Sequence, residues 1–420
     1  MGKAKRRGLL QKNQQPIGKP LLLKPKPLAL KERYYSLDVF RGATVALMIL
    51  VNNPGSWGHI YAPLQHAPWH GCTPTDLVFP FFLFAVGNAM AFVIPRFQAA
   101  NNDGVFWGKV LKRFALIFLI GLFLNWAPFV KWSGDSLVFK AWADAKNPGS
   151  GIRLLGVLQR IAICYLFASI IAYYTKPKLT FFIAAVMLLL FWWMSYAFGG
   201  KADPYSITGF FGTQIDIDLF GKAHVYKGEG MPFDPEGLVS TFAAIVQVLM
   251  GYLTGLYIRE KGKSFEMLSN LFVFGAVLIF AGFAWDMVYP INKKIWTSSY
   301  VVYTTGLALM VIGVLIYLLE FRNAKGAWSK FFDVFGKNPL FIFFLSGFLP
   351  RLVGLIRIPG AIGADGKVHY YSAFSWFYEN ICKNISPDLR AGSLLYALAM
   401  ITMYWFFAWL LDRKKIYIKV

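Results

Sequence analysis

The sequence predicts an all-α membrane protein, a polytopic bundle of about ten transmembrane helices with both termini on the cytoplasmic side. Of its 420 residues, 57% are hydrophobic and only 15% are charged, whereas a soluble globular chain carries about 25% charged residues. The apolar residues also gather into stretches of the length that crosses a bilayer as a helix. Finally, Lys and Arg are distributed unevenly between the segments that join these stretches.

Ten apolar stretches are long enough to be transmembrane helices. In chain order they cover residues 37–54, 75–95, 110–129, 153–174, 179–198, 238–258, 267–289, 297–319, 338–357 and 393–411. If the N-terminus lies inside, the inner segments carry 27 Lys and Arg and the outer segments carry 14. This excess follows the positive-inside rule. The net charge of +22 therefore reflects membrane topology, and we expect no nucleic-acid binding.

The chain divides into a tail and a membrane domain. Residues 1–33 are basic and rich in proline, with only short apolar runs, so they predict a cytoplasmic tail that lies near anionic lipid or simply fixes orientation, without a cleavable signal peptide. Residues 34–420 form the transmembrane domain. The three cysteines, Cys72, Cys164 and Cys382, have neither metal-site nor disulfide spacing. We expect no metal site.

The segment at residues 52–76, between the first two predicted helices, is the most informative part of the sequence. It holds three of the five histidines and no Lys or Arg, and all five histidines fall in predicted outer loops. Such a loop indicates a site at the outer membrane surface. His66 is the first candidate, because Pro68 restricts the backbone beside it and Asp76 is placed to orient its ring. Asp76 is equally suited to cap the second helix.

Polar residues inside the predicted helices form two further groups, and such residues are costly in a membrane and usually functional. Towards the outer end lie candidates for binding a polar substrate: Arg153, Gln159, Arg160 and Asp286, together with Trp69 in the histidine loop. Towards the inner end lie candidates for binding a phosphate-bearing ligand: Asp38, Arg41, Arg113 and Asn338. An interfacial Asp38–Arg41 ion pair and a simple anchoring role for Arg113 explain the inner group equally well.

Several motifs, in matching order and covering nearly the whole chain from residue 34, resemble the membrane domain of the heparan-α-glucosaminide N-acetyltransferase family. They are SLDVFRG at 36–42, VN at 51–52, HAPWHG at 66–71, TDL at 75–77, GVLQRI at 156–161, DPEG at 234–237, NKKIWTSSY at 292–300 and GKNPL at 336–340. Two features depart from the family. A basic tail stands in place of its luminal N-terminal domain, as in a bacterial-type relative, and His70 replaces what is often a small polar residue.

The resemblance implies that an acetyl group from cytoplasmic acetyl-CoA reaches the amine of a glucosamine-type sugar or glycan end across the membrane. It implies that His66 is the active-site histidine and Asn52 its companion, and that the protein forms a homodimer. On this interpretation Asp76 holds the imidazole tautomer, and Arg41 and Arg113 bind the coenzyme phosphates. His66 acts either as a general base or as a nucleophile that carries the acetyl group; the sequence leaves both open.

A different class of function is also compatible with polar groups at both membrane faces, namely an amino-sugar permease that performs no chemistry. The two halves of the chain show no clear internal repeat, which disfavours the usual transporter designs. For either function we expect an integral protein of the bacterial inner membrane, with lipid around it and the histidine loop facing the periplasm or exterior.

Overall fold

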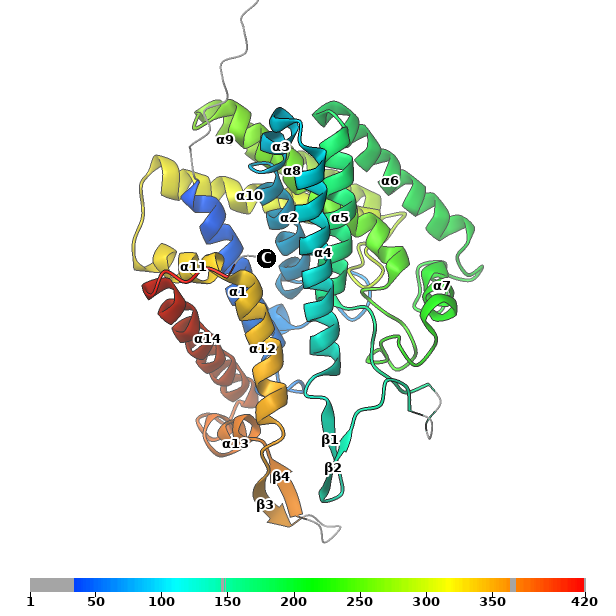
Figure 1. The fold of residues 1–420 in the computed structure, drawn as a ribbon, viewed down its shortest axis with the longest axis vertical. Coiled ribbons are helices and arrows are strands. Elements are labelled where there is room, and N and C mark those ends of the chain that lie inside the picture. The colour runs from blue at the N-terminus through cyan, green and yellow to red at the C-terminus, as the bar shows by residue number, and fades with distance from the viewer. Residues whose placement is uncertain (1–33, 145–146, 148, 363–367, 419–420) are drawn as a thin grey trace, which may run out of the picture. The chain divides into compact units, whose positions relative to one another are not determined.

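The computed structural model describes residues 34–144, 147, 149–362 and 368–418 (Figure 1). The predicted tail at residues 1–33 lies outside this part of the chain. The described residues form a helical bundle with two small antiparallel hairpins, so the predicted all-α class is confirmed. The helices, in order, are α1 (Tyr35–Asn52), α2 (Val78–Met90), α3 (Ile94–Ala100), α4 (Asp103–Trp126), α5 (Val157–Tyr174), α6 (Pro177–Ala197), α7 (Phe211–Phe220), α8 (Leu238–Lys261), α9 (Phe265–Asp286), α10 (Ser298–Ile316), α11 (Ala327–Lys337), α12 (Pro339–Val353), α13 (Ala373–Asn380) and α14 (Leu389–Arg413).

The hairpins and short turns lie between these helices. One hairpin pairs β1 (Val130–Ser133) with β2 (Ser136–Phe139), and the other pairs β3 (Ile358–Ile362) with β4 (Val368–Tyr371). Single turns of 3₁₀-helix occupy Ala62–Leu64, Pro74–Leu77 and Cys382–Asn384, and a π-helical turn, Tyr317–Phe321, extends α10. Figure 1 shows both hairpins and α13 at one end of the bundle, towards which α1, α4 and α12 run.

Local sequence explains where several helices begin. Asn102 precedes α4 and its side chain accepts a hydrogen bond from the Val105 N–H, and Ser264 caps α9 in the same way through the Met267 N–H. Pro177 and Pro339 each stand at the start of a helix, where the missing N–H costs nothing. The same property of Pro339 ends α11 and bends the chain by 78° into α12.

Among the described residues, eight helical segments are long and apolar enough to cross a membrane, and a ninth is added if the bent pair α11 and α12 counts as one. Two of the ten predicted helices therefore need correction. The one at 338–357 is not a single straight helix, because α12 has only 15 residues and breaks from α11 at Pro339. The one at 110–129 overlaps α4, which ends at Trp126 and is about 36 Å long. Lys109, Lys112 and Arg113 in the first half of α4 keep it out of these eight segments.

Small residues bring two central helices into close contact. A Cβ atom on Gly87 of α2 would lie only 1.8 Å from the Val248 carbonyl oxygen of α8, and one on Gly251 would lie 2.1 Å from the Phe84 oxygen. Two glycines facing in this way let the backbones approach directly, as in many membrane helix pairs. The second half of α2, which follows the turn that carries Asp76, is therefore fixed against α8.

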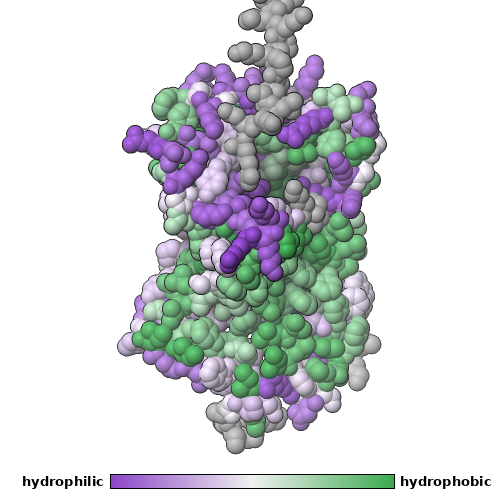
Figure 2. Space-filling model, turned by 60° about the vertical axis from the view of Figure 1, so that its left-hand side comes forward, coloured by the Kyte–Doolittle hydropathy of each residue, from purple (hydrophilic) through white to green (hydrophobic). Residues whose placement is uncertain are grey.

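The outward face near α14 is suited to lipid. Figure 2 shows a broad hydrophobic area on this side, with hydrophilic residues gathered above it. On α14 the exposed large side chains include Leu395, Leu398, Phe406 and Phe407. Exposed apolar side chains of this size are stable next to hydrocarbon and unfavourable in water, which supports the predicted membrane location.

Candidate active site

The candidate site forms where the loop after α1 meets the start of α2. His66 Nδ1 lies 2.6 Å from Asp76 Oδ1, and the Asp76 side chain is almost completely buried. A carboxylate only accepts hydrogen bonds, so Nδ1 carries the hydrogen. The other ring nitrogen, Nε2, therefore has the lone pair, and the His66 side chain is 39% exposed. This is the arrangement of an imidazole prepared to accept a proton or attack a carbonyl group.

Asp76 performs both of the tasks that the sequence suggested for it. While Oδ1 contacts His66, Oδ2 accepts hydrogen bonds from the backbone N–H groups of Ala67 at 3.0 Å and Thr73 at 3.1 Å. The second of these closes the capping box of the turn Pro74–Leu77. One carboxylate thus fixes the start of the helix, the backbone beside the histidine and the ring itself.

The histidine loop is held at further points. The Thr73 hydroxyl donates to the Gln65 carbonyl at 2.6 Å, and the Gly71 N–H donates to the Ile291 carbonyl at 2.7 Å. Gly71 has a φ of +103°, a conformation that favours glycine. The Trp69 indole N–H donates to the Tyr205 carbonyl at 2.9 Å. His66 therefore projects from a fixed loop.

A lysine that we did not select from the sequence completes the site. Lys293, from the segment between α9 and α10, places its Nζ 3.1 Å from His66 Nδ1 and 3.4 Å from Asp76 Oδ1. Burial lowers the pKa of Lys293, although the charges of Asp76 and Glu236 oppose that shift. The available signal was a pair of adjacent lysines, Lys293 and Lys294, in a short loop that is predicted to lie outside, where the positive-inside rule disfavours them.

Two arginines join the start of α5 to the start of α8. Arg153 forms ion pairs with Asp234 and Glu236, and Arg160, fully buried, donates hydrogen bonds to the Gly237 carbonyl at 3.1 Å and the Thr241 hydroxyl at 3.2 Å. Burial alone would raise the pKa of Glu236, but the charges of Arg153 and Arg160 outweigh it and lower that pKa. Both predicted substrate-binding arginines thus bond to neighbouring parts of the protein.

The remaining residues that we predicted near the outer face, Gln159, Asp286 and Asn52, differ in burial and in hydrogen-bond partners. Gln159 is buried and donates to the Leu154 carbonyl at 3.0 Å. Asp286 accepts the Ile291 N–H at 2.5 Å and so supports the segment that presents Lys293. Asn52 is exposed as the last residue of α1. Their predicted substrate and catalytic roles stay predictions.

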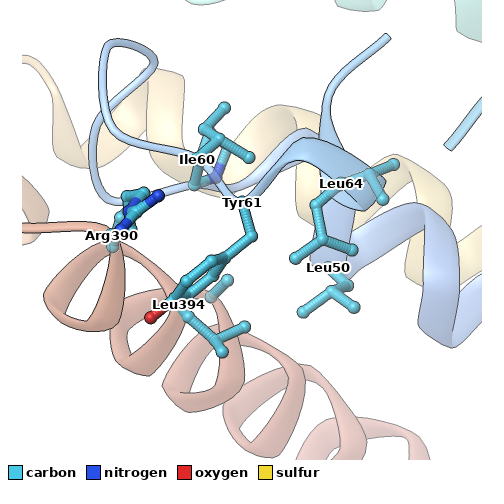
Figure 3. A pocket seen from close by; sticks show the side chains of 10 residues that line it. Leu50, Ile60, Tyr61, Leu64, Arg390 and Leu394 are labelled. Atoms are coloured by element: carbon cyan, nitrogen blue, oxygen red, sulfur yellow. The ribbon is translucent and has the colours of Figure 1, made fainter.

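A small apolar pocket lies beside the histidine loop (Figure 3). Its walls come from the end of α1, the loop and α14, and include Leu50, Leu64 and Leu394. Arg390 stacks 5.2 Å from the centre of the Tyr61 ring and pairs with Asp388. The pocket is thus mainly apolar, and the Tyr61 ring in its wall is stacked against Arg390.

The predicted coenzyme-binding residues lie in α1, α4 and the α11–α12 break. Arg41 donates to the Gly336 carbonyl and to Asp38, both at 2.7 Å, so it links α1 to α11. The Asn338 amide holds the C-terminal segment, donating to the Ile416 carbonyl at 3.0 Å and accepting the Ile418 N–H at 2.8 Å. Their predicted coenzyme-binding roles stay predictions.

Arg113 differs from these residues. Its guanidinium stacks on the Tyr165 ring at 4.6 Å. Its buried Nε has no hydrogen-bond partner among the residues that the structure describes. Of the predicted inner residues, Arg113 therefore has a donor that a bound ligand would satisfy.

The described residues form no cluster of potential metal ligands. Within the described parts of the chain, no three His, Cys, Asp or Glu side chains lie close enough together to hold a metal ion. Cys72, Cys164 and Cys382 are all free thiols. Burial raises the pKa of the Cys72 thiol, which lies in the histidine loop, to about 12, so it is an inert neighbour at neutral pH.

Comparison with known proteins supports the resemblance that the motifs indicated. Residues 33–215, which include His66 and Asp76, match the family model described as "Heparan-alpha-glucosaminide N-acetyltransferase, catalytic". The heparan-alpha-glucosaminide N-acetyltransferases of Homo sapiens and Mus musculus are 25% and 24% identical to this chain over 353 and 350 residues. These alignments cover 72% and 71% of this chain and 50% of each relative, so the chain spans about half the length of the curated relatives it matches. These matches support the family resemblance that the motifs indicated.

Proposed function

We propose that this protein is a transmembrane N-acetyltransferase that moves an acetyl group from cytoplasmic acetyl-CoA to the amine of a glucosamine-type sugar on the other side of the membrane. The observation that carries the proposal is the His66–Asp76 pair. Its 2.6 Å contact leaves Nε2 as the free nitrogen of a partly exposed ring. Acyl transfer to an amine needs a base with this geometry.

The reaction at this site is an exchange of one acyl bond for another. The sugar nitrogen attacks the thioester carbonyl carbon, a C–N bond forms, the C–S bond breaks and the coenzyme leaves as its thiolate. Nε2 of His66 takes the proton that the amine gives up and delivers it to the departing sulfur. Asp76 stabilises the imidazolium in between, because its carboxylate contacts the opposite nitrogen.

Asn52 is our candidate for stabilising the oxyanion. It ends α1, directly before the loop that carries His66, and its amide N–H is a donor of the type that holds a developing negative charge. The apolar pocket lined by Leu50 and Val51 near the end of α1 (Figure 3) is proposed to hold the acetyl methyl group away from water.

The coenzyme is proposed to enter from the opposite end of α1. Arg41 precedes Asn52 by eleven residues, which is about 16 Å along the helix axis, and an extended pantetheine arm spans such a distance. Arg41 and Arg113 are the proposed phosphate partners, of which Arg113 has the buried Nε without a partner in the described part of the chain. Asp38 and Asn338 are proposed to shape this end of the binding site.

The acceptor is proposed to lie over the histidine loop. Trp69, whose indole N–H is already bonded to Tyr205, presents a fixed aromatic ring for the apolar face of a sugar. Asp286, Arg153, Gln159 and Arg160 are proposed to act from below, by holding the backbone that supports this surface. A homodimer in the bacterial inner membrane, as family resemblance implies, completes the proposal.

The decisive test is acetyl transfer by the purified protein in lipid nanodiscs. Radiolabelled acetyl-CoA is supplied with glucosamine, muropeptide amino sugars or glycosaminoglycan ends, and the labelled sugar is separated and counted. Formation of an N-acetyl sugar supports the proposal. Uptake of unmodified amino sugar into proteoliposomes, with no acetylated product from any acceptor, would favour the permease instead.

The orientation has its own test. Trp57, in the histidine loop, is 67% exposed, so a Trp57→Cys variant with the three native cysteines replaced presents an accessible thiol. We expect this thiol to react with a membrane-impermeant maleimide in intact cells or spheroplasts. Reaction only after lysis would place the loop on the cytoplasmic side and overturn the proposed direction of transfer.

A further inference from the structure

We propose that Lys293 is a positioning residue that keeps the His66 imidazole uncharged between turnovers and thereby sets the lower pH limit of acetyl transfer. The inference rests on the proposed function. It assigns a role to a residue that lies 227 positions away from His66 in the chain.

Nδ1 of His66 lies within hydrogen-bond distance of both Asp76 and Lys293. A contact between His66 Nδ1 and a carboxylate requires a hydrogen on Nδ1, whereas a contact between Nδ1 and an ammonium group requires a lone pair there. The contact with Asp76 is 2.6 Å and that with Lys293 is 3.1 Å. The shorter contact places the hydrogen on Nδ1, and Lys293 is then left to donate to Asp76 Oδ1 at 3.4 Å.

The charges of the three groups follow from this assignment. In the resting state the Lys293 ammonium balances the Asp76 carboxylate, and the imidazole is neutral with its lone pair on Nε2. When Nε2 takes a proton, the imidazolium has the Lys293 ammonium group only 3.1 Å from its Nδ1. Asp76 favours this charged ring and Lys293 opposes it, which ensures that the proton is passed on rather than kept.

The position of Lys293 is fixed by the turn that carries it. The buried Asn292 side chain accepts the backbone N–H groups of Lys294 at 2.7 Å and Ile295 at 3.1 Å. The backbone N–H of Asn292 donates to the Thr297 hydroxyl at 3.0 Å. The Gly71 hydrogen bond to Ile291 joins this turn to the histidine loop. The ammonium group therefore has a defined place beside the ring.

The other charged and titratable groups around this triad leave the repulsion from Lys293 in place. Glu236 acts on Lys293 but is already paired with Arg153, and Lys294 is paired with Glu229 at 2.5 Å. The pKa of Cys72 is raised to about 12 by burial. Burial lowers the pKa of His70, against the charges of Asp203 and Asp286.

The test is the dependence of kcat/KM on pH in a Lys293→Met variant, which keeps the length of the side chain and removes its charge. The imidazolium of His66 becomes more stable without the neighbouring ammonium, so a higher pH is needed to obtain the free base. We expect the low-pH limit to move upward by about one pH unit. Lys293→Arg, which keeps the charge, should restore the original limit.

Lys294→Met is the matched control. Lys294 also contacts the histidine loop, donating to the Pro68 carbonyl at 2.9 Å, but its charge is neutralised by Glu229. This variant should alter the rate at every pH by the same factor. An equal pH limit in Lys293→Met and wild type, or an equal shift in Lys294→Met, would overturn the inference.

A second measurement does not depend on activity. Diethyl pyrocarbonate acylates only the uncharged imidazole, so the pH at which the His66 peptide becomes modified, followed by mass spectrometry, reports its protonation directly. We expect this midpoint to rise by about one pH unit in Lys293→Met. Absence of acetyl transfer at any pH would defeat the proposed function, whereas an unchanged modification midpoint would defeat the role of Lys293 specifically.

Discussion

The two polar regions of this protein are organised in opposite ways. At the histidine loop, the Asp76 carboxylate and the Lys293 ammonium group both contact Nδ1 of the His66 imidazole, and among the described residues its other nitrogen is left open. In the predicted coenzyme region, Arg41 bonds to Asp38 and the protein backbone, while Lys337 bridges Asp333 and Asp412. The first arrangement fits the proposed proton transfer. The second joins helices, and in the described part of the chain the buried Arg113 Nε has no hydrogen-bond partner. Substitutions in the two regions should therefore change different kinetic constants.

Removal of the His66 imidazole should lower the rate of acetyl transfer more than any other substitution in the two regions. His66→Ala should lower kcat for acetyl transfer by about 10²–10⁴-fold, the usual contribution of a general acid–base group, while acetyl-CoA binding is retained. His59→Ala is the control, because His59 is an exposed residue of the same loop and should cost little. Equal losses in both variants, measured with the same radiolabelled assay, would remove His66 from the chemistry.

The next largest effect should come from Asp76→Asn. The amide keeps the size of the carboxylate and still accepts the Ala67 and Thr73 N–H groups, but it no longer favours the imidazole that carries its hydrogen on Nδ1. We expect kcat to fall by about 10²-fold with little change in coenzyme affinity. Calorimetric binding of coenzyme A separates this result from misfolding, since a misfolded variant loses binding as well.

Substitutions in the predicted coenzyme region should change the affinity for coenzyme A. Arg113→Ala removes a cation with an unsatisfied buried Nε, so the Kd for coenzyme A should rise by about tenfold, the value of one charge-assisted hydrogen bond. Arg113→Lys should recover part of this loss. Lys112→Ala, at the exposed neighbouring position, is the control and should leave Kd unchanged. A loss of kcat at saturating coenzyme, with Kd unchanged, would contradict the division between the two regions.

The difference between the regions also explains what the sequence alone predicted. The histidine loop combines three histidines, no basic residue and a nearby aspartate within 25 residues, so the His66–Asp76 contact followed from local spacing. Lys293 contacts the same ring across 227 residues of chain, and no local pattern encodes such a contact. Similarly, Arg153 and Arg160 looked available on a helix, but Asp234, Gly237 and Thr241 from a distant segment occupy them.

The membrane helices show the same limit. Composition predicted nearly all of them, because apolar length is a local property. The break at Pro339 was missed since the apolar stretch continues through it, although proline at that point marks a helix start as readily as a kink. The close packing of α11 against α1 through Gly42 and Gly336 was likewise not revealed by sequence spacing.

The smallest expected effect concerns Asp216, which supports the outer region without touching the reacting groups. Its carboxylate accepts the Leu238 N–H at 2.9 Å and so caps α8, while burial raises its pKa to about 7. The folded protein therefore binds this proton more tightly than the unfolded chain. Its contribution to stability is present at acidic pH and is lost as the pH rises to about 7.

Asp216→Asn keeps the cap acceptor and removes the charge that forms above that pH. The variant should match wild type below about pH 4, where the carboxyl group is neutral in both the folded and the unfolded chain. At pH 8 it should melt about 2 °C higher, with kcat/KM unchanged there. Thermal unfolding followed by tryptophan fluorescence measures the first quantity and the acetyl-transfer assay the second. A variant that melts lower at pH 8, or one that loses activity while keeping its Tm, would show that Asp216 belongs with the reacting groups around His66 rather than with the framework beneath them.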